Sequence, residues 1–258
     1  MRPPGPPETP PFEADELFDD DYLYFYRNTH ADEQSETATD RVWKLLELQP
    51  GMDLLDLCCG TGRIANRLAA RGCRVTGLDR SARFLELARE DARARGVTVE
   101  YVHGDMREIP WAGRFDRVVN WFTAFGYFDD EENRRALGAA HAALRPGGLL
   151  LIETLHRDRM LRNFRPEGVV ERDGDYMIDH HRFEVTTGRM VVERVLIREG
   201  RVRRVRWFVR CFPYTELRDW LLQAGFTEVR GCQPDGEPLT LDSPRMVWIA
   251  RKGEGAAR

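Results

Sequence analysis

The length and composition of the chain favour a single globular domain. Its 258 residues are 42% hydrophobic and 10% aromatic, which is enough to bury one substantial core. The formal net charge of −4 gives no overall basic field, so neither nucleic acid nor an anionic membrane surface is favoured as a partner. A small-molecule ligand fits this charge better.

The cysteines and the N-terminal residues bear on the compartment. Five cysteines without a C-x-x-C pair disfavour a disulfide framework and a zinc site, and they favour a reducing, cytoplasmic environment. Residues 1–13 form a proline-rich leader that is expected to be disordered and that lacks the regions of a signal peptide. No run of 18 apolar residues occurs, so no membrane span is predicted.

An aromatic segment and a helix precede a regular alternation of strands and helices. Residues 14–36 are rich in tyrosine and phenylalanine and are expected to form a flap. Apolar spacing predicts a helix within 35–51, with Ser35 or Thr37 as its cap. Strands are predicted at 52–58, 73–79, 97–105, 115–122 and 147–155, with helices at 63–72, 81–96 and 130–145. This alternation is typical of a parallel sheet with helices on both faces.

A second kind of sheet is predicted from residue 164 onward. Strands at 176–185, 189–199 and 201–212, joined at glycine-containing turns, indicate a three-stranded antiparallel insertion, and we expect 164–212 to act as a lid. The chain then returns to the main sheet with a helix at 215–225 and strands at 226–232 and 245–252. The domain therefore spans 14–252, and 253–258 form a flexible tail.

The stretch "LLDLCCGTGRI" (54–64) joins a predicted strand to a helix through a glycine turn. Glycines let the backbone approach a ligand and a helix N-terminus offers free N–H groups, so the junction suits a nucleoside or an anion. Residues 60–65 also match the G-x-G-x-x-A form of a dinucleotide fingerprint, which alone is a weak signal.

Two aspartates help to decide between these ligands. Asp79 ends the second strand 19 residues after Gly60, where a carboxylate can accept hydrogen bonds from both ribose hydroxyls of NAD or of an adenosyl compound. Asp56 lies inside the first strand, where a carboxylate needs a donor or a positive charge. S-adenosylmethionine has an ammonium and a sulfonium group that NAD lacks, so Asp56 favours S-adenosylmethionine.

Four motifs, in this order, resemble the class I S-adenosylmethionine-dependent methyltransferases. They are "LLDLCCGTG", "VTGLD", "VHGDM" and "LRPGGLLLIET", and the similarity covers roughly residues 40–155 and 212–252. The resemblance implies an α/β, Rossmann-like, seven-stranded, mostly parallel sheet with an antiparallel last strand, to which this chain adds the three-stranded insertion. A bacterial subgroup with a general methyltransferase label also shares "YLYFY", "FTAFGYF", "ETLHRD" and "DSPRMVWIARK".

The resemblance assigns residues to S-adenosylmethionine, with S-adenosylhomocysteine as the product and no metal. The residues expected to bind the cofactor are Asp56, Cys58, Gly60, Gly62, Asp79, Arg80, Asp105, Met106 and Asn120. Within this set, Asp56 and the two glycines line the methionine end, Asp79 holds the ribose, and Asp105 with Met106 borders the adenine. Cys58 stands where many relatives have glycine.

The acceptor side is expected in the flap and after the fourth strand. Candidates for contacting the acceptor are Tyr26, Trp121, Thr123, Phe125 and Tyr127, although an aromatic run is also normal in a core. His156 and Tyr127 are candidate catalytic bases, needed only if the acceptor must lose a proton, and His156 has a capping or surface role as its alternative. Trp121 and Phe122 replace the prolines of the motif found in base-amine methyltransferases, which further disfavours nucleic acid.

The predicted function is in-line transfer of a methyl group from S-adenosylmethionine to a small-molecule acceptor, with the N, O or C atom left open. Two alternatives also stay open, an NAD-dependent oxidoreductase and a catalytically silent, nucleoside-binding regulatory protein. A membrane partner is not expected, and a homodimer is left open.

Overall fold

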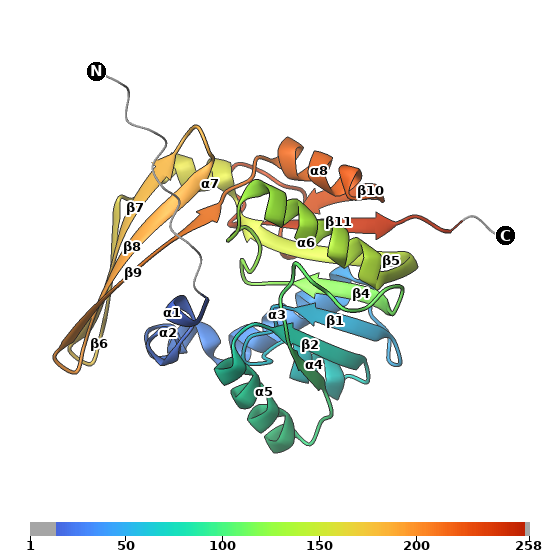
Figure 1. Cartoon of the computed structure of the whole chain (residues 1–258), viewed down its shortest axis with the longest axis horizontal. Coiled ribbons are helices and arrows are strands. Elements are labelled where there is room, and N and C mark those ends of the chain that lie inside the picture. Colours follow the sequence, from blue (N-terminus) through green and yellow to red (C-terminus); the bar gives the residue numbers. More distant parts are fainter. Residues whose placement is uncertain (1–13, 256–258) are drawn as a thin grey trace.

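The computed structural model of the chain describes residues 14–255 and contains a large sheet flanked by helices, with a smaller sheet beside it (Figure 1). The predicted leader (1–13) and the end of the predicted tail (256–258) lie outside the described residues. Residues 253–255 follow the last strand without regular structure.

The larger sheet has seven strands in the order β10-β11-β5-β4-β1-β2-β3. These strands are β1 (Asp53–Leu57), β2 (Arg74–Asp79), β3 (Glu100–His103), β4 (Phe115–Asn120), β5 (Leu144–Leu155), β10 (Phe226–Cys232) and β11 (Arg245–Lys252). β11 runs antiparallel to both of its neighbours, and β1 pairs in parallel with β2 and β4. The predicted seven-stranded sheet with an antiparallel last strand is confirmed. The strand order reverses between β1 and β4, and ligands of such sheets bind beside the carboxyl ends of the strands at this point.

Helices cover both faces of the large sheet because successive residues of a strand point to opposite sides. Leu54 of β1 belongs to a core shared with α3 and α4, and Leu55 belongs to a core shared with α6 and α8. The helices around the sheet are α3 (Asp32–Leu45), α4 (Ala65–Ala70), α5 (Ala82–Arg95), α6 (Asp130–Ala143) and α8 (Tyr214–Gln223). None of the helices between residues 14 and 255 has the length and apolar content to cross a membrane.

The start of α3 differs from the prediction. The helix begins directly after Ala31, so Ser35 and Thr37 lie inside it and neither is its N-cap. Their hydroxyl groups donate instead to the backbone carbonyl oxygens of Ala31 and Glu33 in the preceding turn. No side chain caps this helix.

The smaller sheet contains four antiparallel strands, so the prediction of three was wrong. The strands, in this order, are β6 (Glu167–Arg172), β7 (Asp175–Glu184), β8 (Arg189–Arg198) and β9 (Arg201–Arg210). The missed β6 pairs with β7 around Asp173 and Gly174, whose φ angles of 52° and 85° suit a two-residue hairpin turn. β6 is an edge strand with Val169 and Val170 exposed, so no apolar alternation marked it.

The N-terminal segment packs on the smaller sheet. It contains the short helices α1 (Ala14–Leu17) and α2 (Asp20–Phe25) and the 3-10 helix η1 (Arg27–His30), and α7 (Arg157–Arg162) follows β5. Leu17 and Phe25 share a buried core with Met177, Val205 and Trp207 of the smaller sheet. The N-terminal segment is therefore held by this sheet rather than by the large one.

Candidate functional site

A pocket lies where the carboxyl ends of β1, β2 and β4 meet the N-terminal segment. β1 and the glycine turn after it contribute Asp56, Cys58, Cys59, Gly60, Thr61, Arg63 and Ile64. The end of β2 and the segment after it contribute Asp79, Arg80, Ser81 and Phe84, and the segment after β4 contributes Trp121, Phe122, Thr123, Ala124, Tyr127 and Phe128. Phe18 and Tyr22 line the pocket from the N-terminal segment.

Asp79 ties the end of β2 to the glycine turn. Its Oδ2 accepts a hydrogen bond from the backbone N–H of Gly60 and its Oδ1 accepts one from the N–H of Ser81, both at 2.8 Å. Burial raises the pKa of Asp79, while the backbone N–H groups of Ser81 and Gly60 act in the opposite direction. The backbone of Arg80 also hydrogen-bonds this carboxylate, and because its two oxygens have about four lone pairs for three backbone N–H groups, Asp79 can still accept a hydrogen bond from a ligand in the pocket.

Asp56 presents an unpaired oxygen at the pocket wall. The side chain is buried, its carboxylate accepts a hydrogen bond from the N–H of Ala65, and its Oδ2 has no hydrogen-bond partner among the described residues. Burial, followed by the charge of Asp79, raises the pKa of Asp56 to about 7. A buried carboxylate oxygen without a hydrogen-bond partner is costly, and a ligand ammonium would satisfy this oxygen. The site therefore fits the methionyl end of S-adenosylmethionine.

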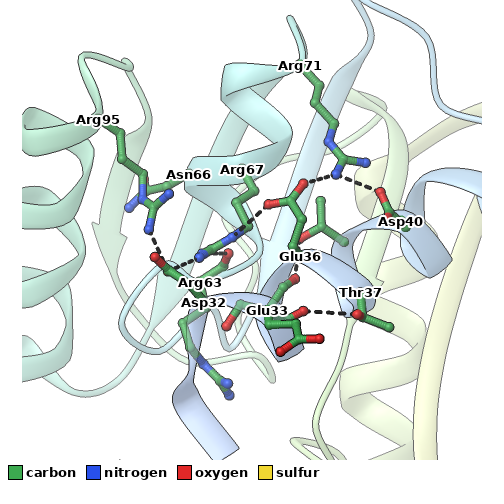
Figure 2. Close-up of polar contacts among 12 residues, drawn as sticks. Asp32, Glu33, Glu36, Thr37, Asp40, Arg63, Asn66, Arg67, Arg71 and Arg95 are labelled. Atoms are coloured by element: carbon green, nitrogen blue, oxygen red, sulfur yellow. Dashed lines mark hydrogen bonds and ion pairs between the residues drawn. The ribbon is translucent and has the colours of Figure 1, made fainter.

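The helix that follows the glycine turn is anchored by a buried guanidinium (Figure 2). Arg67 of α4 is 5% exposed, contacts Asp32 and Glu36 of α3, and donates to the backbone oxygen of Arg63 at 2.8 Å. Arg95 of α5 reaches Asp32 at 3.0 Å from the other side. These contacts fix α4 against α3 and α5, and so fix the backbone N–H groups of the turn.

Cys58 and Gly62 shape the turn in different ways. Cys58 has a φ of 63°, in the left-handed region that favours glycine, which gives a physical reason for glycine at this position in relatives. Burial raises the pKa of the Cys58 and Cys59 thiols well above the ordinary value, so neither is a ready nucleophile. Gly62 lies outside the set of residues that line the pocket, and a Cβ there would stand 2.2 Å from the Tyr101 hydroxyl.

Of the two residues predicted beside the adenine, Met106 lines the pocket and Asp105 does not. Met106 is buried and lines the pocket, as does Arg80. Asp105 does not line it and instead pairs with Arg107 at 2.7 Å and with Arg80 at 3.6 Å. Asp105 is therefore placed to orient the Arg80 side chain.

The predicted acceptor residues also divide. Trp121, Thr123 and Tyr127 line the pocket. Phe125 is buried in the core and stacks on Phe212 with ring centroids 5.5 Å apart. Only some of the aromatic side chains in the loop after β4 therefore line the pocket.

Asn120 and Tyr26 do not line the pocket, but each makes a hydrogen bond beside it. Asn120 donates from Nδ2 to the backbone oxygen of Leu57 at 2.9 Å, which joins the ends of β4 and β1. The Tyr26 hydroxyl accepts a hydrogen bond from Arg194 at 2.8 Å, and its ring lies 4.6 Å from that of Tyr22.

Neither of the two predicted bases, His156 and Tyr127, is placed and ionised so that it could act as a base on a ligand in this pocket. His156 lines a different pocket with Arg157, Tyr214 and Thr240, and its Nδ1 has no hydrogen-bond partner among the described residues. Tyr127 lines the main pocket, but burial raises the pKa of its phenol, so the hydroxyl stays protonated near neutral pH. Tyr127 can donate a hydrogen bond there.

Several residues of the pocket were not predicted as site residues. Those with large side chains are Phe18, Tyr22, Arg63, Phe84, Phe122 and Phe128. Phe18 and Tyr22 are four residues apart at the start of the chain, and their rings lie 5.2 Å from each other. Both residues belong to the aromatic segment 14–36 that was expected to form a flap, and this aromatic content was the available signal for them. Between residues 14 and 255, no cluster of three or more His, Cys, Asp or Glu side chains could hold a metal ion.

Comparisons with known proteins agree with this geometry. Residues 54–148 match the family described as methyltransferase domain. A Geobacillus sp. (strain WCH70) protein named as a methyltransferase is 28% identical over 208 residues, which cover 77% of this chain and 84% of that protein.

Solved structures share the fold. An S-adenosylmethionine-dependent methyltransferase from Clostridium acetobutylicum superimposes with a TM-score of 0.78 at 16% identity, over 91% of this chain and 98% of its own. The S-adenosylmethionine-bound amino pentose methyltransferase CalS10 from Micromonospora echinaspora does so with a TM-score of 0.63 at 22% identity, over 93% and 100% of the two chains. Residues 54–148 therefore match a methyltransferase domain, and the chain is similar in sequence and in fold to S-adenosylmethionine-dependent methyltransferases.

Proposed function

We propose that this methyltransferase acts on a small-molecule amine that meets the methyl group between the segment after β4 and the N-terminal segment. One observation carries the proposal, a pocket that combines two kinds of lining. The carboxyl groups of Asp56 and Asp79 line it beside the glycine turn, and the rings of Trp121, Phe122 and Tyr127 line it from the segment after β4.

The carboxyl groups of Asp56 and Asp79 suit the cofactor. Asp56 can accept a hydrogen bond from the methionyl ammonium through its unpaired Oδ2, and Asp79 can accept from a ribose hydroxyl through its remaining lone pair. Met106 and Phe84 offer apolar surfaces for the adenine. When bound, S-adenosylmethionine supplies a methyl group that an acceptor nitrogen takes with its lone pair, while the sulfur keeps the electrons of the broken C–S bond.

The side chains that the segment after β4 contributes to the pocket favour an acceptor that needs no protein base. The Tyr127 phenol is held protonated by burial, which raises its pKa, and His156 lines another pocket. A neutral amine already carries the lone pair that attacks, and the product can release its proton to water, whereas an alcohol requires a base in the transition state. CalS10, which has this fold, is named as an amino pentose methyltransferase, so the named substrate of that protein carries an amino group.

The N-terminal segment would exclude water from the reacting groups. The Phe18 ring packs 6.5 Å from Phe84 and 5.8 Å from Tyr127, and Tyr22 packs 6.2 Å from Phe84. These contacts link Phe84 and Tyr127 under one aromatic cover, and holding the reactants aligned in a dry site is the main source of rate in such a transfer. In this proposal residues 14–36 act as the flap, and 164–212, which contribute no residue to the lining of the pocket, act as a lid only through their packing against that segment.

A turnover assay tests the proposal. The protein is incubated with S-adenosylmethionine labelled in its methyl group and with matched panels of primary and secondary amines, phenols and carboxylates. We expect label in at least one amine, with Tyr127→Phe retaining activity within about tenfold, because loss of a base would cost more. Binding of S-adenosylhomocysteine without turnover on any panel would contradict the proposal and favour the nucleoside-binding regulatory alternative.

Two further expectations stay predictions. A cytoplasmic location is expected from the cysteine usage, and a homodimer remains open. Sedimentation of the purified chain over a range of concentrations tests the second.

A further inference from the structure

Three segments that lie far apart in the sequence meet at one ion pair. Glu153 belongs to "ETLHRD" at the end of β5, Arg245 belongs to "DSPRMVWIARK" at the start of β11, and Thr123 belongs to "FTAFGYF" after β4. The Glu153 carboxylate contacts Arg245 through both oxygens, and its Oε2 also accepts the backbone N–H of Thr123 at 3.1 Å. The position of the loop after β4 is therefore coupled to the β5–β11 pair.

The loop that Glu153 holds has an unfavourable backbone. Phe122 and Thr123 have φ angles of 60° and 56°, in the left-handed region where side chains other than glycine are disfavoured, and a β-branched residue is disfavoured most. Both residues line the pocket, and the Arg63 guanidinium lies 4.0 Å from the centre of the Phe122 ring. A strained backbone persists only where its surroundings hold it, and such strain concentrates at functional sites.

Glu153 is suited to hold this conformation because it is fixed itself. Its side chain is 6% exposed, and that of Arg245 is 27% exposed. The planar guanidinium binds the carboxylate with Nε and Nη2, a two-point contact that fixes the orientation of both groups. Glu153 and Arg245 do not line the pocket, so neither touches the ligand directly.

We propose that Glu153 and Arg245 are positioning residues that hold residues 121–124 in the shape that receives the methyl acceptor. This inference rests on the proposed function, because it assigns this wall of the pocket to the acceptor. Replacing a buried ion pair by apolar residues is often neutral or stabilising, so packing alone does not account for a 6% exposed carboxylate that accepts the backbone N–H of Thr123. The carboxylate oxygen that accepts from Thr123 sets the position of Trp121, Phe122 and Thr123 relative to the methyl group.

Glu153→Gln keeps an oxygen that can accept from Thr123 but loses the charge that Arg245 binds. The double variant Glu153→Gln/Arg245→Met removes the partner as well, so that no buried cation is left unpaired if the single variant is unstable. Glu228→Gln is the matched control, because Glu228 also pairs with an arginine of β11, Arg251 at 3.2 Å, but is 75% exposed and lies outside the pocket.

Amide hydrogen exchange and steady-state kinetics are then measured for all three variants. In Glu153→Gln and the double variant we expect exchange of the 121–124 amides to be at least tenfold faster, with the Kd of S-adenosylhomocysteine within threefold of wild type. With an amine acceptor, kcat/KM should fall at least thirtyfold, with KM raised, and Glu228→Gln should match wild type in every measurement.

Unchanged exchange at 121–124, or an equal loss of cofactor binding and acceptor turnover, would overturn the inference. The exchange and cofactor measurements need no acceptor. If the wild-type protein turns over no acceptor, the proposed function fails in that assay, and the exchange at 121–124 still decides whether Glu153 and Arg245 hold the loop.

Discussion

The carboxylate of Asp79 accepts a hydrogen bond from the backbone N–H of Gly60 at 2.8 Å, so the end of β2 and the glycine turn form one unit. Asp79→Ala removes this bond, the bond to Ser81 and the acceptor expected for the ribose. Hydrogen bonds to charged groups contribute about 1.5–3 kcal/mol each, so affinity for S-adenosylhomocysteine should fall at least about thirtyfold. Calorimetry measures this loss, and Asp219→Ala, an exposed aspartate of α8, is the control. An unchanged affinity in Asp79→Ala would remove the ribose assignment.

The pKa of about 7 for Asp56 predicts a pH dependence of cofactor binding. The ligand ammonium favours the ionised carboxylate, so binding requires Asp56 to lose its proton below about pH 7. Affinity for S-adenosylhomocysteine should therefore fall by up to about tenfold per pH unit as the pH drops below 7. Calorimetry between pH 5.5 and 7.5 avoids titration of the ligand ammonium, and Asp56→Asn should bind weakly with little pH dependence. The same slope in Asp56→Asn as in wild type would contradict the assignment.

Because the backbone at Cys58 is left-handed, we expect glycine at this position to cost less stability than valine. Cys58→Gly relieves the strain at a φ of 63° but removes a partly buried side chain, so stability should change by no more than about 1 kcal/mol. Cys58→Val places a β-branched residue there and should cost roughly 2 kcal/mol or more. Urea denaturation measures both, with Cys232→Val, a buried cysteine at the end of β10, as the control. Equal costs of valine at 58 and 232 would argue against backbone strain at Cys58.

The contacts of Arg203 with the N-terminal segment predict that this segment slows the dissociation of the ligand. Its guanidinium donates to the backbone oxygen of Glu16 and to the carboxylates of Asp19 and Asp21, so Arg203→Ala should loosen the segment that carries Phe18. Because these ion pairs are partly exposed, global stability should change by less than about 1 kcal/mol. S-adenosylhomocysteine should nevertheless dissociate several times faster, as measured by stopped-flow fluorescence.

The control for this experiment lies on the same strand. Arg206 of β9 pairs with Glu193 at 3.3 Å within the smaller sheet, and Arg206→Ala should leave the dissociation rate unchanged. Equal rates for Arg203→Ala and wild type would show that the cover does not limit release.

The cofactor side of the pocket could be predicted because its geometry is local and regular. Asp56 and Asp79 follow from the alternation of strands and helices, since neighbouring parallel strands bring their carboxyl ends together. Gly60 follows from the turn between strand and helix. The packing of Gly62 against Tyr101 required the structure, because Tyr101 belongs to a different strand.

The acceptor side could not be predicted residue by residue because it depends on irregular backbone. The left-handed conformation of Phe122 and Thr123 redirects the chain, so no period of two or 3.6 residues foretells that Tyr127 lines the pocket and Phe125 does not. His156 lies at the junction of β5 and α7, where side-chain direction depends on tertiary packing.

Two elements were missed for different reasons. β6 has an exposed edge without apolar alternation, although the Asp-Gly pair at 173–174 was a recognisable hairpin signal. α3 begins after Ala31, which caps poorly, because the contacts of Asp32 and Glu36 with Arg67 stabilise its first turns from outside the helix. Local capping preferences could not foretell this start.

Calorimetric titration of the wild-type chain at pH 7.5 with S-adenosylhomocysteine and, separately, with NAD tests the ligand assignment most directly. We expect one S-adenosylhomocysteine bound per chain and no heat of binding with NAD. Binding of NAD without binding of S-adenosylhomocysteine would contradict the assignment of Asp56 to a ligand ammonium and of the pocket to a methyl donor.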